Sequence, residues 1–201
     1  MQKQNKQKQS ILNYKAIDFI ILSVFAFFMA WGIYAVVKWD KEFIFDRFFA
    51  ASIVLAIFFL YRKMKLSLPT LLVGAFALVL HHLKLYQNTY LGVPFDHYMH
   101  LAGGFALALI FSEYFINSEK KPNHVKTFFL SVCMAAGIGS FMEIIEFIGK
   151  CVLGAGQGLL YYGDGDWGEY NNTAWDMINN TIGAVISSCI MFCVSRFKKR
   201  R

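Results

Sequence analysis

Long runs of apolar residues, separated by short polar segments, constrain this chain more than any other feature of its sequence. A run of about 20 apolar residues is long enough to cross the hydrocarbon core of a bilayer as a helix. Helices are expected because they satisfy their own backbone hydrogen bonds inside lipid. The sequence therefore predicts an all-α, polytopic membrane protein with six transmembrane helices: Ala16–Val37, Ile44–Tyr61, Leu66–Tyr86, Asp96–Ile116, Thr127–Gly149 and Ala174–Val194.

The composition leaves little chain for a separate soluble domain. Apolar residues make up 57% of the chain and charged residues 16%, whereas a soluble domain carries about 25% charged residues. We expect a single six-helix transmembrane domain over residues 16–195, with an outer loop over residues 150–173. Basic tails are expected over residues 1–15 and 196–201.

The basic residues indicate how this domain lies in the membrane. Of the 20 Lys and Arg residues, 15 fall in the two tails and in the second and fourth loops. Cytoplasmic loops are enriched in Lys and Arg, so six spans would place both termini in the cytoplasm, and five spans would not fit this alternation. The basic tails would contact anionic lipids. The net charge of +7 therefore requires no nucleic-acid partner.

The polar residues inside the spans gather at one depth. Because consecutive spans run in opposite directions, the following residues all lie near outer ends: His81, His82, Asp96, His97, His100, Glu143, Glu146, Trp175, Asp176, Asn179 and Asn180. The inner halves of the spans are nearly free of ionisable groups, with Glu113 as the main exception. An ionisable residue inside a span is costly and marks a functional site by default.

Helical spacing brings several of these residues onto shared faces. Asp96 and His100 are four residues apart, as are Asp176 and Asn180, and residues at this spacing lie one above the other on a helix. Small residues follow on the same faces and let membrane helices approach closely. We therefore expect these faces to meet around a hydrated site in the outer leaflet.

Some of these residues also have simpler explanations. Asp96 and Asp176 begin spans, where a carboxylate can cap free backbone N–H groups. His82 and His97 are expected at the membrane interface. The two acids that end the fifth span have no such role, because an acid near the C-terminus of a helix opposes the helix dipole.

Carboxylates gathered this closely would repel one another unless protons, charged histidines or a cation intervened. A divalent metal would compensate them most completely. Asp, Glu and His together suit Zn or Mn, and a set of oxygen ligands suits Mg. The expected metal ligands are Asp96, His100, Asp176 and His81.

The order of these motifs resembles a known family. D-x-x-x-H at Asp96–His100, E-x-x-E at Glu143–Glu146 and W-D-M-x-x-N at Trp175–Asn180 resemble the YjdF-like family of bacterial inner-membrane proteins, and more distantly the VanZ-like family linked to glycopeptide resistance. The resemblance covers residues 94–187 and implies a multi-pass protein of the bacterial plasma (inner) membrane. VanZ-like proteins commonly carry Gln where Glu146 stands, and the loop before the last span is longer and more Asn-rich here than in the YjdF type.

Three functions remain open. The first is a metal-dependent hydrolase of lipid or lipid-linked envelope substrates, in which Glu143 or Glu146 acts as general base and a metal-bound water as nucleophile. The expected substrate contacts are Asn180, Asn179, Asp166, Trp167 and Trp175. The second is capture of an envelope precursor or a glycopeptide-type antibiotic without chemistry, as the VanZ-like resemblance implies. The third is a small transporter, which the scarcity of ionisable groups in the inner halves disfavours.

Overall fold

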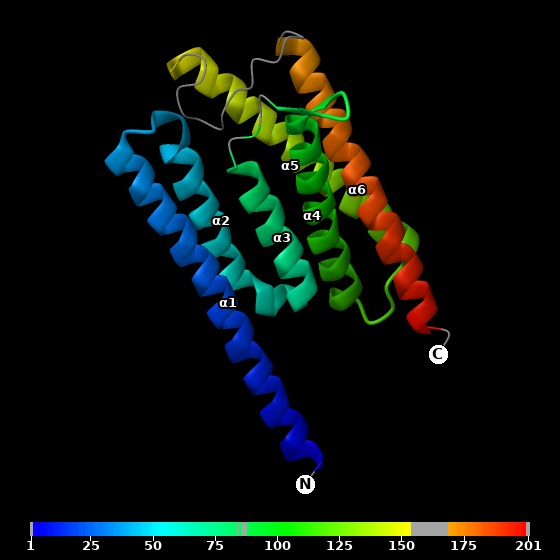
Figure 1. Cartoon of the computed structure of the whole chain (residues 1–201). Helices are drawn as coiled ribbons and strands as arrows, with labels where there is room; N and C mark the ends of the chain where they lie inside the picture. Colours follow the sequence, from blue (N-terminus) through cyan, green and yellow to red (C-terminus); the bar gives the residue numbers. More distant parts are fainter. Residues whose placement is uncertain (1, 84, 86–87, 154–168, 200–201) are drawn as a thin grey trace.

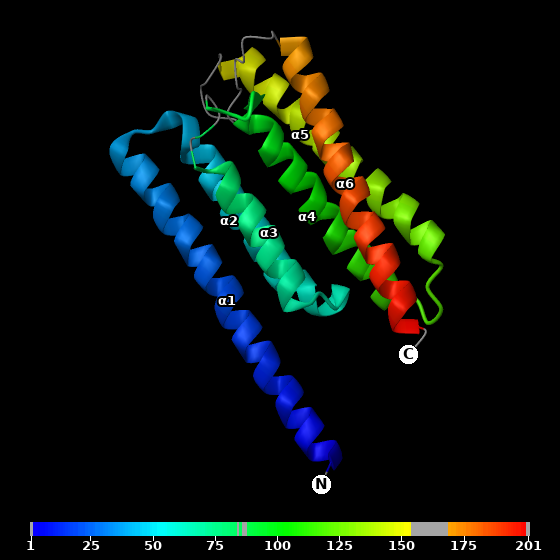
Figure 2. The same cartoon turned by 45° about the vertical axis from the view of Figure 1, so that its right-hand side comes forward.

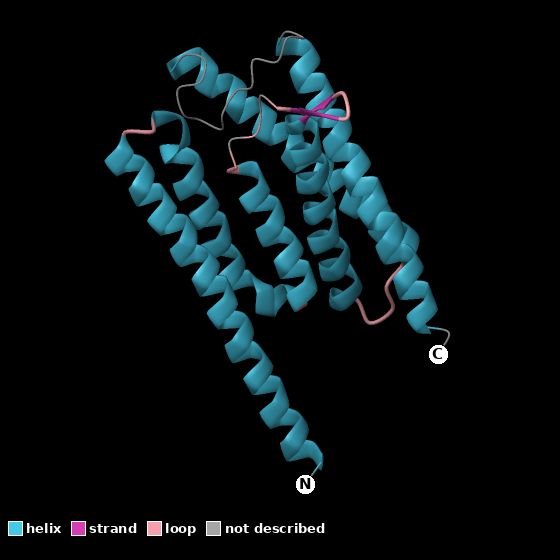
Figure 3. Cartoon of the chain, viewed as in Figure 1, coloured by secondary structure: helices cyan, strands magenta, loops and turns pink. Residues whose placement is uncertain are grey.

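Six helices and one short hairpin make up the part of the chain that the structure describes. The computed structural model describes residues 2–83, 85, 88–153 and 169–199. The helices are α1 (Gln2–Lys38), α2 (Lys41–Met64), α3 (Leu68–His81), α4 (Phe95–Ser118), α5 (His124–Leu153) and α6 (Glu169–Lys199). Strands β1 (Thr89–Tyr90) and β2 (Val93–Pro94) form an antiparallel hairpin between α3 and α4 (Figures 1 and 3).

Five of these helices, α1, α2, α4, α5 and α6, are long and apolar enough to cross a membrane. Helix α3 has 14 residues and extends about 21 Å at 1.5 Å per residue. The hydrocarbon core of a bilayer is about 30 Å thick. The prediction of an all-α, multi-pass membrane protein is confirmed in this form: five candidate spans and one shorter apolar helix.

The third predicted span, Leu66–Tyr86, differs most from the structure. Its helix begins at Leu68, with Pro69 in the first turn, where proline is tolerated because its missing N–H needs no intrahelical partner. The helix ends at His81. The prediction of a continuous helix through residue 86 was therefore wrong: the backbone N–H groups of His82 and Leu83 donate to carbonyls three residues back, in a tight turn that ends the helix.

The hairpin fixes the chain at the start of α4. Leu91 and Gly92 form its turn with φ values of 53° and 78°, and two consecutive positive φ values are typical of a type I′ hairpin turn. The backbone N–H of Phe95 donates to the carbonyl of Asn88 at 2.8 Å. The Tyr98 hydroxyl donates to the carbonyl of Tyr90 at 3.0 Å. The hairpin is thus hydrogen-bonded to the first turn of α4.

The helices form two groups. Helices α4, α5 and α6 pack as a bundle, α1 pairs with α2, and α3 lies against α4 between the groups (Figure 2). Both chain termini lie at one end of this arrangement, whereas the hairpin and the starts of α4 and α6 lie at the other (Figure 1). We call the second end the hairpin end.

The packing of α1, α2 and α3 is mainly apolar. Its buried residues include Phe28, Ala50, Val54, Tyr61 and Leu71. The Tyr61 hydroxyl donates a hydrogen bond of 2.5 Å to Oδ1 of Asp18, and Arg62 forms an ion pair with the same carboxylate. This polar contact ties α2 to α1 at the end that holds the termini.

Glycines allow α4 and α6 to cross in close contact. A Cβ atom on Gly104 would lie 2.0 Å from the carbonyl oxygen of Asn180, and one on Gly183 would lie 2.0 Å from the carbonyl oxygen of Leu101. No larger residue fits at either position without moving the helices apart. The predicted small residues beneath the polar ones therefore lie where membrane helices approach most closely.

The helices extend into segments that the sequence assigned to tails and loops. Helix α1 begins at Gln2, so its backbone continues through the predicted tail at residues 1–15. Helix α6 runs to Lys199, into the predicted tail at residues 196–201. Helices α5 and α6 also take up both ends of the predicted outer loop at residues 150–173, and residues 154–168 lie outside the described residues.

Candidate functional site

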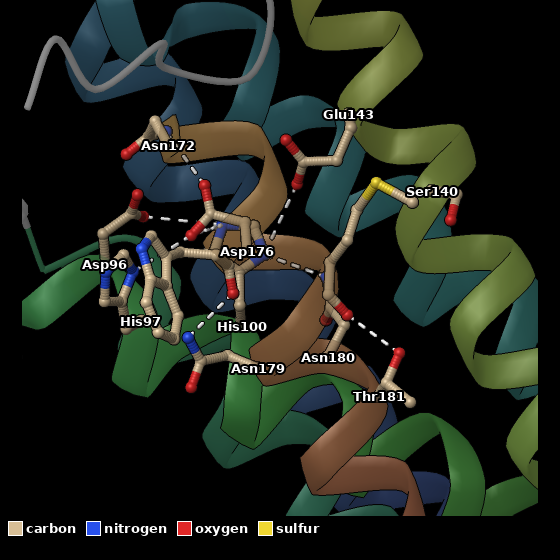
Figure 4. Close-up of polar contacts among 12 residues, drawn as sticks. Asp96, His97, His100, Ser140, Glu143, Asn172, Asp176, Asn179, Asn180 and Thr181 are labelled. Carbon is tan, nitrogen blue, oxygen red and sulfur yellow. Dashed lines mark hydrogen bonds and ion pairs between the residues drawn. The ribbon is translucent and has the colours of Figure 1, made fainter. Parts of the chain in front are cut away.

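Three helices bring acids and histidines together at the hairpin end (Figure 4). The first turns of α4 supply two histidines and an aspartate, α5 supplies a glutamate near its end, and α6 supplies an aspartate in its second turn. We call this group the carboxylate–histidine cluster: Asp96, His97, His100, Glu143 and Asp176. Four of its members are at most 9% exposed, and the His100 side chain is 15% exposed.

His100 is the centre of the cluster. Its Nε2 lies 3.5 Å from Oδ1 of Asp96 and 3.6 Å from Oδ1 of Asp176. Its Nδ1 lies 3.6 Å from Oε1 of Glu143. Carboxylates from three different helices thus surround one imidazole, which confirms that the predicted polar faces of these helices meet.

Asp176 connects the two histidines of α4. Its Oδ1 lies 3.2 Å from Nδ1 of His97, and its Oδ2 accepts a hydrogen bond of 2.9 Å from Nδ2 of Asn172. Asp176 is 1% exposed. Since α6 begins at Glu169, Asp176 lies inside the helix, and the capping role considered from the sequence is wrong for this residue.

Asp96 lies in the first turn of α4, where a negative charge interacts favourably with the helix dipole. The N-cap residue of that helix is Pro94, and no side chain caps it. The carboxylate of Asp96 instead faces the ring of His100, one turn further along. The position at the start of the helix therefore explains why a negative charge is stable here. The contact with His100 explains why the Asp96 carboxylate points into the cluster.

His97 and Asn172 were missed as site residues by the sequence reasoning. His97 was expected at the interface, but it is 8% exposed and contacts Asp176. The signal was its spacing of three residues from His100, because residues three or four apart are neighbours on a helix surface. Asn172 precedes Asp176 by four residues, the spacing used for the other pairs.

Asn180 orients the ring of His100. Its Nδ2 lies 3.1 Å from Nδ1 of His100, and the residue is 5% exposed. Gly139 of α5 makes room for it, since a Cβ atom at Gly139 would lie 2.8 Å from that Nδ2. By contrast, the Asn179 amide donates to the carbonyl of Trp175 in its own helix at 2.8 Å. Of the two predicted asparagines, Asn180 therefore contacts the cluster.

The remaining predicted residues lie around the cluster or beyond the described part of the chain. His81 lines a cavity next to His100, and Glu146 is half-buried one turn after Glu143. Trp175 is 42% exposed and its ring centroid lies 6.0 Å from that of His97. Asp166 and Trp167 fall among the residues that the structure does not describe.

The donor atoms are close enough for one small cation to bind several of them. Within the described residues, two groups of donors each lie within 4.8 Å of one another: Asp96, His97 and Asp176, and His100, Glu143 and Asp176. Asp176 belongs to both groups. Neither group contains His81 or Glu146. Imidazole nitrogens with carboxylate oxygens are a common ligand set for Zn and Mn.

Comparison with known proteins gives a family for the chain. No curated protein and no solved structure matches it. A family model described as "Predicted membrane protein (DUF2238)" matches residues 17–197, a range that includes the whole carboxylate–histidine cluster. The match extends over most of the 201 residues, so the chain belongs to this family of membrane proteins.

Proposed function

We propose that the carboxylate–histidine cluster binds a divalent cation and that the protein is a metal-dependent hydrolase of lipid or lipid-linked envelope substrates. The observation that carries this proposal is the convergence of Asp96, Glu143 and Asp176 on the buried ring of His100. Within the described residues, the ion-pair partners of these carboxylates are histidines. A divalent cation would offset the repulsion among the acids, which a histidine alone offsets only in part.

The ligand set is revised from the sequence-based one. His100, Asp176 and Asp96 remain expected ligands, and His97 replaces His81 in the set expected from the sequence. Zn or Mn would suit the mixed set, and Mg would suit the carboxylates alone. When bound, such an ion would lower the pKa of a bound water molecule, to about 7 in the case of Zn.

Glu143 would accept a proton during hydrolysis. Its Oε1 is buried, lies 3.6 Å from Nδ1 of His100 and accepts no hydrogen bond from the residues that the structure describes, so it can accept one from a water molecule at the centre of the cluster. General bases of this kind contribute about 10²–10⁴-fold to a rate. Asn180 would hold the His100 ring in one orientation, as the outer-shell partners of metal ligands do. Glu146, one turn further along α5, would tune the charge around Glu143.

We also propose that α3 completes a sixth crossing and that both termini lie in the cytoplasm. This orientation is supported by the basic residues near the termini and by the opposite directions of consecutive helices (Figure 1). The hairpin end then lies in the outer leaflet of a bacterial plasma membrane, at the depth of lipid headgroups, in keeping with the YjdF-like resemblance. A membrane-impermeant thiol reagent should label exposed Cys151 on intact cells, with Cys151→Ser as control. Labelling only after lysis would invert the orientation.

Hydrolysis is tested with the purified protein in vesicles of bacterial lipid extract, after metal depletion and reloading with Zn, Mn or Mg. Product release should require metal and should fall by about 10²–10⁴-fold in Glu143→Gln. Glu113→Gln is the matched control, because Glu113 accepts a hydrogen bond from the Ser67 N–H at the opposite end of α4. A rate in Glu143→Gln equal to that of the control would remove Glu143 from the mechanism.

Binding without chemistry is the second candidate, and one observation favours it. Trp175 is 42% exposed beside His97, and sites that bind small molecules combine aromatic side chains with a few polar groups. The VanZ-like resemblance points the same way, toward an envelope precursor or a glycopeptide-type antibiotic. If this second function is correct, the protein in the same vesicles should bind a lipid or the antibiotic, and no hydrolysis product should appear with Zn, Mn or Mg.

A further inference from the structure

An apolar cleft lies next to the cluster. Helices α1 and α2 form one wall, α4 and α5 the opposite wall, and α3 a third. Its volume is about 510 Å³, within the range of about 300–1,000 Å³ that small-molecule sites occupy. The lining side chains are mostly aliphatic and include Val24, Ile53, Leu78, Ala106, Ile110 and Met142.

The cleft is long and has one polar end. On α2 its lining runs from Asp46 to Met64, which is about 27 Å of helix at 1.5 Å per residue. At the hairpin end it is lined by Asp46, His81, His82, His100 and Asn180. His100 and Asn180 therefore belong both to the cleft and to the candidate site. A ligand that fills this space has a long apolar body and a polar group at one end.

The cleft is narrow. A volume of about 510 Å³ is spread over about 27 Å of helix. A single extended hydrocarbon chain fits a long, slender apolar space of this kind and leaves its polar end beside His100 and Asn180.

Small residues leave this space open instead of closing it. Among the described residues, the one atom within 4 Å of a Cβ on Gly74 would be Ile110 Cδ1, at 3.7 Å, and for Gly103 it would be Oδ1 of Asn180, at 3.9 Å. At the α4–α6 crossing, by contrast, a Cβ atom on Gly183 would lie 2.0 Å from backbone. Glycine thus permits close helix contact at the α4–α6 crossing, whereas at Gly74 and Gly103 it leaves the cleft wide enough for a hydrocarbon chain.

We propose that this cleft binds one hydrocarbon chain of an amphiphile, with its polar headgroup at the carboxylate–histidine cluster. This inference rests on the proposed function for the position of the headgroup, and it names the substrate class: a lipid whose reacting group is joined to a long acyl or polyprenyl chain. The chain enters from the bilayer and lies between the two helix groups. The headgroup then meets His100 and Asn180.

The test uses a long-chain alkyl phosphate with a diazirine at the chain end, incorporated into lipid nanodiscs with the protein. Photolabelling should modify cleft residues of α2 and α3, as mapped by peptide mass spectrometry. Ala77→Phe fills the cleft, and overpacking of this kind should lower labelling by about tenfold, or about 1.4 kcal/mol of binding. Ala56→Phe is the matched control, since Ala56 is exposed on α2 and does not line the cleft.

Gly74→Leu provides a second filling variant should Ala77→Phe fail to fold, with thermal unfolding as the check on both. Competition by phosphatidic acid or by a polyprenyl phosphate distinguishes the acyl from the polyprenyl source. Labelling that persists in both filling variants, or that maps only to lipid-facing residues, would overturn the proposal. The two proposals can fail separately. Cleft labelling in a protein that shows no metal-dependent turnover would reject the proposed hydrolase and keep the cleft as a chain-binding site.

Discussion

The crossing of α4 and α6 gives a sharp prediction for Gly183→Ala. The substitution adds one carbon atom, which would lie 2.0 Å from the carbonyl oxygen of Leu101. Ordinary van der Waals contact begins at 3.4 Å. The two helices must therefore separate locally by about 1.4 Å, the difference between these distances.

This separation would act directly on the candidate site, because Leu101 follows His100 on α4 and Gly183 lies two turns after Asp176 on α6. Overpacking a close-packed interior costs about 1–3 kcal/mol, and backbone atoms cannot move aside as a flexible side chain does. Metal sites tolerate deviations of only about 0.2 Å in ligand distance. We expect Gly183→Ala to destabilise the protein by about 2–3 kcal/mol and to weaken metal binding by about 10–100-fold.

Gly137→Ala is the matched control for this experiment. A Cβ atom at Gly137 meets nothing within 4 Å, and alanine in a helix is about 0.8–1.0 kcal/mol more favourable than glycine. Stability is measured by thermal unfolding in one detergent, and metal affinity by titration of the metal-free protein. If Gly183→Ala unfolds at the same temperature as Gly137→Ala and binds metal equally well, the close crossing does not position the site.

Three further outcomes are expected. Asn180→Ala should weaken metal binding by about 10–100-fold, because the ring of His100 loses its outer-shell partner; Asn179→Ala should not, and equal effects in metal titrations would contradict the distinction. Tyr61→Phe should cost about 1–2 kcal/mol in thermal unfolding, because the hydroxyl donates one hydrogen bond to Asp18 and accepts one from Arg62; an unchanged unfolding temperature would argue against these contacts. The hydrogen bond from Lys126, at 3.0 Å, lowers the pKa of Glu119 below its ordinary value. The stability that this ion pair contributes is therefore fully present at a pH above the ordinary pKa of Glu and is lost as the pH falls through the lowered pKa. In Lys126→Met the NMR titration of the carboxyl should return to the ordinary range, and an unmoved titration would exclude the ion pair in solution.

The sequence was enough to predict which helix faces carry the site. Asp96 and His100, like Asp176 and Asn180, lie four residues apart, and helical geometry alone brings each pair onto one face. Because consecutive spans run in opposite directions, these residues could also be predicted to lie at the same depth in the membrane. This is why the acids of α4, α5 and α6 could be predicted to meet without any knowledge of their packing.

Helical periodicity could not predict what depends on tertiary contact. His97 lies beside Asp176 because of how α4 and α6 cross, and His81 lines the cleft because α3 packs against α4 between the two helix groups. The end of α3 at His81 was missed because an apolar run looks alike in a full span and in a shorter helix. The cleft has no sequence signature, since it is a space between helices that is lined by residues from all six of those described.

The most direct test of the account is the metal content of the purified protein. Wild type, prepared without metal-affinity resin and equilibrated with Zn, Mn and Mg in turn, is compared by elemental mass spectrometry with a His100→Ala, Asp176→Asn double variant. His124→Ala, at the opposite end of the bundle where His124 contacts Ser195, is the control. We predict about one divalent ion per chain in wild type and control, and none in the double variant, which lacks two of the central ligands. Folded wild type that retains none of the three metals would contradict it.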